Sequence, residues 1–426
     1  MISSLKISSF KSILDADIEF GNVNVFIGSN GSGKSNVLEA IGLFSACLER
    51  GVDAQTLDYK GIRLSAPHIF KSSFKNRRLP RAIRLEGTVA DLEYKASLQA
   101  GEHSSHLQFF TESMTAGGRP VFSRAPRGFR LGDKSMARST ADALYLDPHR
   151  SLWDTHGANL DTIGKSARMA LREISRYAIY TPQTAVMRGI VPDHRATEPL
   201  GLTGSRLPQA FRELLRQYRK SKGKGADVQR QREIGEALKM IWAPGWASKV
   251  KVGPPDIDTV PEHLPASKET IHIVDKFLTV KRNTLSPYDA SEGTLYLIFM
   301  AVLLAHSEAP AVFALDNVDG TLNPRMVRFL VEHIVDAVDG NISEDGENTH
   351  PKQVFLTSHN PTALDAIDLF DPGKRLFVVS RNQQGHTIFD RIRPPENMTK
   401  ERWIEAMRGR NLSQLWLDGK IRKALG

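Results

Sequence analysis

The residues best suited to chemistry lie in one eight-residue segment, GSNGSGKS, which runs from Gly28 to Ser35. It fits the pattern G-x-x-x-x-G-K-[ST], follows a short apolar run and precedes a helical pattern. Glycines let backbone N–H groups turn inward around phosphates, and a helix N-terminus adds a partial positive charge. Lys34 can then reach the β- and γ-phosphates of a nucleotide, while the Ser35 hydroxyl can bind Mg²⁺. The residues expected to contact the nucleotide are Asn30, Gly31, Ser32, Gly33, Lys34, Ser35 and Asn36.

A second signal is the segment AVFALD, which ends at Asp316. An apolar run followed by Asp is typical of a buried strand that delivers a carboxylate to the ligand-binding edge of a sheet. Asp316 is expected to hold Mg²⁺ together with Ser35, directly or through a water molecule. A strand that ends in Asp is common, and the metal role is favoured because the same chain contains the phosphate loop.

The elements that must position these residues alternate between strands and helices. After the phosphate loop, apolar residues recur at three- and four-residue spacing from Val37 to Leu48, which predicts a helix. Three apolar segments, AVFALD, QVFLTSH and RLFVVSRN, predict core strands, and a helix is expected near 324–338 between the first two. Strands of this kind, separated by helices, indicate a mainly parallel sheet covered on both faces.

Other segments complete the predicted organisation. Residues 82–112 are predicted to form antiparallel strands, whereas the Gly-, Ser- and Arg-rich residues from about 113 to 140 are interpreted as a loop or a partly mobile insertion. Residues 207–242 predict two short helices, too short for long coiled-coil arms. The stretch 271–282 predicts a strand, and the helix expected from about residue 293 is apolar on nearly every side and should be buried.

Composition excludes several classes of protein. The chain has 426 residues, and 57 Lys plus Arg against 48 Asp plus Glu give a net charge of +9. The lone cysteine, Cys47, excludes a disulfide framework and a cysteine-based zinc site. No apolar run approaches the ~18 residues of a membrane span, and the N-terminus lacks the apolar region of a signal peptide. We expect a soluble, cytoplasmic protein without a membrane partner.

The order GSNGSGKS, ASEGT, FALDNVDGTLNP and TSH resembles the ABC-type ATPases of the SMC, RecF and OLD group. The resemblance is dense at residues 1–50 and 285–385 and thin between them. It implies an α/β fold: an ABC/SMC-type ATPase head with a mixed sheet, an antiparallel N-terminal subdomain and an inserted helical lid. The implied divisions are 1–150 for the Walker A lobe, 151–265 for the lid, and 266–426 for the second half of the head.

The resemblance also implies roles for residues outside the phosphate loop. Ser291 and Gly293, in the signature-like SEGT, would cap the γ-phosphate of ATP bound by a second subunit. His359 would contact the γ-phosphate as a switch residue, and Lys11 matches a basic position that approaches nucleotide in relatives. Gln183 could belong to the Q-loop, although a solvated glutamine is the favoured interpretation. In the D-loop, Asn323 occupies a position where relatives often have Asp.

One position departs from the group. Relatives place Glu directly after the Walker B Asp, where it polarises the attacking water, but this chain has Asn317. A neutral amide can hold a water but cannot accept its proton, and general-base assistance is worth about 10²–10⁴-fold. Three interpretations stay open: slow hydrolysis with ATP acting as a clamp, a carboxylate supplied by Asp319, or an engineered substitution that traps ATP.

The group implies Mg·ATP as cofactor and head-to-head self-association, with a higher oligomer as a further option. The C-terminal NLSQLWLDGKI resembles the end of short, nuclease-free members such as the Septu-type ATPase of bacterial antiphage systems. We therefore expect a nucleotide-gated sensor or scaffold that acts with a separate effector such as a nuclease. Nucleic-acid contact is a further option, through the basic stretches 71–84 and 216–224. The alternative is a RecF-like, DNA-binding repair ATPase.

Overall fold

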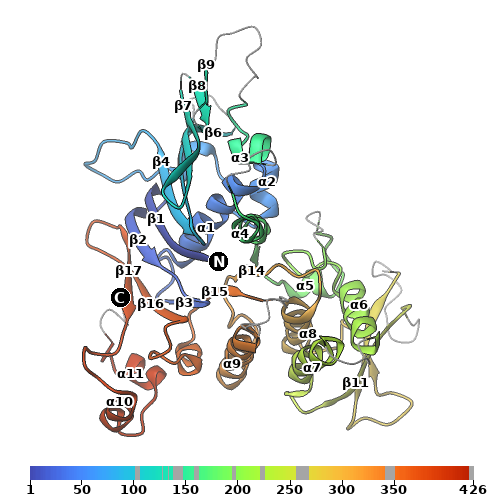
Figure 1. Ribbon diagram of the computed structural model, residues 1–426. Helices are drawn as coiled ribbons and strands as arrows, with labels where there is room; N and C mark the ends of the chain where they lie inside the picture. Colours follow the sequence, from blue (N-terminus) through green and yellow to red (C-terminus); the bar gives the residue numbers. More distant parts are fainter. Residues whose placement is uncertain are drawn as a thin grey trace. The chain divides into compact units, whose positions relative to one another are not determined.

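A computed structural model describes residues 1–100, 106–126, 128–132, 134–137, 147–157, 163–193, 198–220, 226–255, 268–340 and 351–421. The chain divides into two compact units: residues 1–179, 312–318 and 353–426 form the first, and residues 180–311 and 319–352 form the second. Figure 1 shows the elements of each unit. No helix in the described ranges is long and apolar enough to cross a membrane.

The first unit contains a six-stranded mixed sheet with the order β10-β14-β15-β3-β16-β17 (Figure 1). Strands β14, β15, β3 and β16 are parallel, and β17 is antiparallel to β16. The central strand β3 has a neighbour on each side and is buried at all five residues. The bounds are β3 Val23–Ile27, β10 Ile179–Tyr180, β14 Val312–Leu315, β15 Gln353–Ser358, β16 Lys374–Arg381 and β17 Thr387–Ile392.

A second sheet of the first unit is antiparallel throughout, with the order β2-β1-β4-β5-β6-β7-β8-β9. This confirms the antiparallel N-terminal part of the expected α/β fold. The bounds are β1 Ile2–Phe10, β2 Ile13–Glu19, β4 Ile83–Val89, β5 Leu92–Ala100, β6 Leu107–Ala116, β7 Arg119–Ala125, β8 Gly128–Leu131 and β9 Lys134–Ala137.

The interpretation of residues 113–140 as a loop is wrong for the residues that the structure describes. Strand β6 continues to residue 116, and β7, β8 and β9 follow as hairpins. The glycines that suggested a loop make the turn instead: Gly117 and Gly118 both have positive φ, 52° and 77°, as a tight hairpin connection requires. Residues 127, 133 and 138–140 lie outside the described ranges.

Helices of the first unit pack on these sheets. Helix α1 follows the phosphate loop, and its predicted apolar face from Val37 to Leu48 is buried, as expected. Helix α4 packs against α1, where the Ser45 hydroxyl donates to the carbonyl of Ile174 at 2.7 Å. This packing keeps the chain in the first unit up to residue 179, beyond the expected division at 150. The bounds are α1 Lys34–Glu49, α2 Ala54–Tyr59, α3 Leu152–His156, α4 Lys165–Ser175, α10 Lys400–Met407 and α11 Leu412–Leu417, with short 3₁₀ turns at Pro67–Phe70 and Pro361–Ala366.

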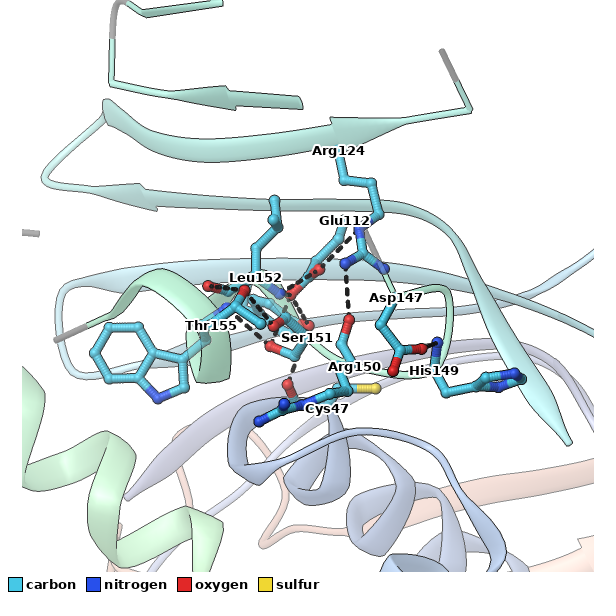
Figure 2. Close-up of polar contacts among 11 residues, drawn as sticks. Cys47, Glu112, Arg124, Asp147, His149, Arg150, Ser151, Leu152 and Thr155 are labelled. Carbon is cyan, nitrogen blue, oxygen red and sulfur yellow. Dashed lines mark hydrogen bonds and ion pairs between the residues drawn. The ribbon is translucent and has the colours of Figure 1, made fainter. Parts of the chain in front are cut away.

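A buried ionic cluster joins the antiparallel sheet to α3 (Figure 2). Glu112 on β6 accepts hydrogen bonds from the Tyr94 hydroxyl at 2.9 Å, the Ser151 hydroxyl at 3.0 Å and the backbone N–H of Leu152 at 3.0 Å. The Arg124 guanidinium lies 3.7 Å from the same carboxylate and also donates to a backbone carbonyl. Burial raises the pKa of Glu112, and the nearby Arg124 opposes that shift. With 2% of Glu112 exposed, the cluster is a structural anchor closed to solvent.

The second unit is largely helical. Helix α8 is buried from Thr294 to Ala305, as its uniformly apolar sequence predicts, and it contacts α5, α6 and α7. The strand predicted over 271–282 ends at Asp275, and residues 276–282 are exposed. The bounds are α5 Thr184–Met187, α6 Leu207–Lys220, α7 Ala226–Lys239, β11 Ala247–Gly253, β12 Thr270–Asp275, β13 Thr284–Leu285, α8 Glu292–Ala305 and α9 Pro324–Gly340, with a 3₁₀ turn at Met240–Trp242.

Candidate functional site

The phosphate-loop sequence forms a tight connection between β3 and α1 in the first unit. Gly33 has φ of 106°, and a Cβ atom there would lie 2.2 Å from the Thr387 hydroxyl oxygen. That hydroxyl donates to the carbonyl of Ser32 at 2.9 Å, and Ser32 itself is buried. Glycine is therefore required at position 33, both by the left-handed backbone and by the contact with β17.

Lys34 points back over the loop that precedes it. Its Nζ atom donates to the carbonyls of Gly28 at 2.8 Å and Ser29 at 2.9 Å, and it lies 3.1 Å from Nδ1 of His359. Two residues that are 325 positions apart in sequence thus meet at the mouth of the loop. This arrangement holds one cation and one imidazole beside the backbone that would cradle phosphates.

Asp316 follows β14 and faces the start of α1. The Ser35 hydroxyl donates to Oδ1 of Asp316 at 3.1 Å, so the two predicted metal ligands are in contact. A hydroxyl beside a carboxylate is the oxygen-rich combination that Mg²⁺ prefers when phosphate oxygens complete its coordination. Elsewhere in the described ranges, no three His, Cys, Asp or Glu side chains gather as a metal site. The residues present therefore fit magnesium held jointly with a nucleotide.

Asn317 adopts the left-handed conformation, with φ of 60°. Its backbone N–H donates to the Thr357 hydroxyl at 2.8 Å, and its side chain is exposed toward the cavity above the phosphate loop. Among residues with a side chain, Asn tolerates this conformation well because its short polar side chain forms local hydrogen bonds. The backbone at this position thus favours Asn over Glu.

A cavity of about 290 Å³ collects most of the predicted nucleotide-binding residues. Two arginines that the sequence analysis did not identify also line it, Arg63 and Arg381. Arg381 donates to the carbonyl of Gly31 at 2.9 Å, which supports the loop from β16. The predicted residues in the lining are Asn30, Gly31, Gly33, Lys34, Ser35, Asn36, Asn317 and His359.

Next to it lies a larger cavity of about 830 Å³, which shares Asn36, Arg63 and Arg381 with the first. Lys11, the predicted basic residue of the β1–β2 turn, lines this second cavity. Its ammonium forms an ion pair with Glu39, whose other carboxylate oxygen binds Arg63. Burial lowers the pKa of Lys11, and Glu39 opposes the shift.

Glu39 is a residue at the candidate site that the sequence analysis missed. It lies on α1, is only 2% exposed, and holds both cations at the edge of the two cavities. A glutamate within an apolar helical stretch is the signal that would have identified it, because a buried carboxylate needs a cationic partner. Its partners come from residues 11 and 63, and sequence spacing alone does not show that these are neighbours.

The signature-like residues belong to the second unit. Ser291 is the N-cap of α8, and its hydroxyl accepts a hydrogen bond from the Thr294 N–H at 3.2 Å. Before the helix, Arg188 donates to the carbonyls of Pro287 and Ala290 at 3.0 and 3.1 Å. Gly293 follows Ser291 in the first turn of α8. The segment is thus a fixed helix start with an exposed Ser291, as an anion-binding role requires.

Three other predicted residues are also part of the second unit. Asn323 accepts a hydrogen bond from the Met326 N–H at 3.0 Å, which caps the start of α9. The pKa of the buried Tyr296 is raised, mainly by burial and in addition by the negative charge of Asp319. Gln183 is exposed at the start of α5.

Several solved structures resemble the chain in general arrangement. The SMC head domain from Thermotoga maritima is 14% identical with a TM-score of 0.43, and the comparison covers 92% of this chain and 99% of that one. The recombination mediator protein RecF-ATPrS of the RecFOR pathway is 14% identical with a TM-score of 0.38, covering 92% and 98%.

Sequence families give the firmer comparison. Residues 1–66, which contain the phosphate loop, match the family described as "AAA ATPase domain". Residues 193–365, which contain Ser291, Asp316 and His359, match the family described as "AAA domain, putative AbiEii toxin, Type IV TA system". No curated protein matches the chain in sequence. Both matched families are ATPase domains, and the chain is therefore an ATPase.

Proposed function

We propose that the chain binds Mg·ATP in the cavity above the phosphate loop and hydrolyses it slowly, using ATP as a clamp. The observation that carries this proposal is the convergence of Lys34, His359, Ser35 and Asp316 from α1, β14 and β15. Lys34 and the loop N–H groups bind the β- and γ-phosphates. Ser35 and Asp316 hold Mg²⁺, which when bound neutralises charge that develops on the phosphates. The neighbouring cavity of about 830 Å³, which shares Asn36, Arg63 and Arg381 with the first, would leave room for the nucleoside.

The binding test replaces the cation that faces the phosphates. Lys34→Ala should abolish ATP binding, measured by the fluorescence of a labelled ATP analogue titrated with the full chain. The matched control is Lys6→Ala, an exposed lysine on β1 outside the cavity. Tight binding by Lys34→Ala, with the control unchanged, would contradict the assignment of the site.

Slow hydrolysis follows from Asn317, which can orient a water molecule but cannot take its proton. Restoring a carboxylate with Asn317→Glu should raise ATP turnover, by less than the ~10²–10⁴-fold that a well-placed base supplies. The gain should be limited because Glu must adopt a φ near 60° at this position. If the native chain already turns over rapidly and Asn317→Glu adds nothing, the clamp proposal is wrong.

Self-association is part of the same proposal. In a head-to-head dimer, Ser291 and Gly293 of one subunit would cap the γ-phosphate bound by the other, because a helix N-terminus with an exposed hydroxyl favours an anion. Light scattering should show a larger species with ATP than without it, and Gly293→Arg should remove the difference while leaving ATP binding intact. A chain that stays monomeric with bound ATP would exclude action in trans.

For the biological role, we propose a nucleotide-gated sensor or scaffold of a bacterial defence complex with a separate effector. Its support is the resemblance of the C-terminal segment to short, nuclease-free ATPases, together with a matched family whose description names a toxin–antitoxin system. The RecF-like alternative, in which ATP gates DNA binding, rests on the motif order from GSNGSGKS to TSH, which resembles the SMC, RecF and OLD group as a whole. Co-expression with neighbouring genes separates the two: ATP-dependent co-purification of an adjacent nuclease favours defence, whereas ATP-dependent binding of duplex DNA by the chain alone favours repair.

A further inference from the structure

Thr357 is a buried residue of β15 that the sequence analysis treated only as context for His359. Strand β15 lies between β14, which leads to Asp316, and β3, which leads to the phosphate loop. The register pairs Leu315 with Leu356 and Thr357 with Phe26. Thr357 is therefore one residue past the last β14–β15 pair, beside the point where β14 ends. Its relative exposure is 0%.

The Thr357 hydroxyl both donates and accepts a hydrogen bond, and both of these bonds are with the segment that follows β14. It donates to Oδ1 of Asp316 at 2.5 Å and accepts the backbone N–H of Asn317 at 2.8 Å. The carbonyl of Thr357 also accepts the N–H of Val318 at 2.9 Å. One residue thus holds the carboxylate of position 316 and the backbone of the next two positions.

The two hydroxyls that bind Asp316 converge on the same oxygen. Ser35 donates to Oδ1 at 3.1 Å, and Thr357 donates to Oδ1 at 2.5 Å. Within the described ranges, Oδ2 receives no hydrogen bond from the protein, so the carboxylate is fixed through one oxygen with the other left for a ligand. A hydrogen bond of this kind fixes the direction of a metal-binding carboxylate and is a common requirement around metal ligands.

We propose that Thr357 is a positioning residue of the ATPase site: its hydroxyl orients Asp316 toward Mg²⁺ and holds Asn317 in its left-handed conformation. This inference rests on the proposed function, in which Asp316 serves the metal. A purely structural threonine would need only that its hydroxyl be satisfied, which any buried carbonyl could provide. Here the donor goes to the predicted metal ligand and the acceptor to the residue beside it, so one hydroxyl couples the two positions.

The test compares variants that keep or remove the hydroxyl. Thr357→Ser keeps it, Thr357→Val removes it at nearly constant volume, and Thr56→Val is the control, a buried threonine on α2 whose hydroxyl donates to Asp53. For each, a fluorescent ADP analogue is titrated without metal and then with increasing Mg²⁺, and ATP turnover and thermal unfolding are recorded. The metal-free titration reports the phosphate loop, and the Mg²⁺ titration reports Asp316.

Thr357→Val should weaken the apparent Mg²⁺ affinity about 10–100-fold, the usual effect of losing such a partner, with metal-free binding nearly unchanged. Thr357→Ser and Thr56→Val should behave as the native chain does. Equal Mg²⁺ affinity in Thr357→Val and the native chain would overturn the proposal, as would equal losses in Ser and Val variants. If Thr357→Val does not fold, the same loss of Mg²⁺ affinity is expected for Thr357→Ala. Failure of both variants to fold would overturn the proposal, because Thr357 would then be a core residue only. Absence of nucleotide binding by the native chain would instead refute the proposed function.

Discussion

The buried pair of Glu112 and Arg124 gives the sharpest test of how the first unit is held together (Figure 2). Side-chain exposure is 0% for Glu112 and 3% for Arg124. The carboxylate also receives hydrogen bonds from Tyr94, Ser151 and the start of α3. Glu112→Gln preserves the shape and one acceptor oxygen but removes the charge. The variant therefore leaves a buried guanidinium without its counter-charge.

Removing one partner of a buried ion pair costs about 3–5 kcal/mol, because the remaining charge is desolvated without compensation. For a unit of this size, each kcal/mol lowers the melting temperature by roughly 2–4 °C. We therefore expect the first unit of Glu112→Gln to melt on the order of 10 °C below the native chain. Combining Glu112→Gln with Arg124→Met should cost less than the sum of the single changes, because the second change removes the stranded charge.

Scanning calorimetry of the full chain measures the shift, and hydrogen exchange of the peptides that cover β6 and α3 localises it. The matched control is Glu93→Gln on the neighbouring strand β5, an exposed glutamate that should change stability by less than about 0.5 kcal/mol. A shift of only a degree or two for Glu112→Gln, or exchange that accelerates equally throughout the chain, would refute the reasoning. It would mean that the pair is hydrated or that α3 is held by other contacts.

Three further changes test other parts of the structure. Gly33→Ala should eliminate nucleotide binding in a fluorescence titration, because a Cβ atom would lie 2.2 Å from the Thr387 hydroxyl at a φ of 106°; retained binding would contradict the described loop. Asn317→Glu should lower the free energy of unfolding by about 1 kcal/mol in denaturant titrations while Asn317→Gly does not, since φ there is 60°; equal stabilities would show that the backbone is unstrained. Trp416→Ala should cost about 3–5 kcal/mol in the same titrations because this α11 side chain is 6% exposed, and a loss below 1 kcal/mol would show that α11 is not docked.

Much of the fold could be predicted because its signals are local. The apolar run of β3, the glycine-rich loop and the helical spacing of α1 occur within the 27 consecutive positions from Val23 to Glu49, so short-range periodicity is enough to identify them. Helix α8 could be predicted for the same reason, because a helix that is apolar on nearly every side must be buried. The errors arose where composition and conformation disagree. Gly117 and Gly118 indicated a loop but form a hairpin turn, and residues 276–282 alternate like a strand but lie exposed.

The site was predicted only as far as its motifs extend. Lys34, Ser35 and Asp316 are recognisable because each occupies a set place within a short pattern, and the structure brings them to one sheet edge. Glu39 and Arg381 have no such pattern. Their contacts with Lys11 and with the carbonyl of Gly31 join residues 28 and 350 positions apart. The contact of Arg381 with Gly31 exists only once β16 pairs with β3, and that of Lys11 with Glu39 only once the β1–β2 turn packs near α1, so both depend on long-range packing.

The sheet order also changes how Asn317 should be understood. From the sequence, Asn317 occupies a position where relatives have a glutamate, and the simplest expectation is that Glu at this position would restore a general base. In the structure, the N–H of Asn317 donates to the Thr357 hydroxyl and its φ is 60°. The left-handed backbone therefore favours Asn at this position whatever its catalytic role. A carboxylate introduced there must adopt this φ at a conformational cost, directly beside the hydroxyl that contacts Asp316. Because Thr357 contacts both positions, Asn317→Glu combined with Thr357→Val should not show independent effects on Mg²⁺ affinity, whereas two unconnected residues would give additive changes.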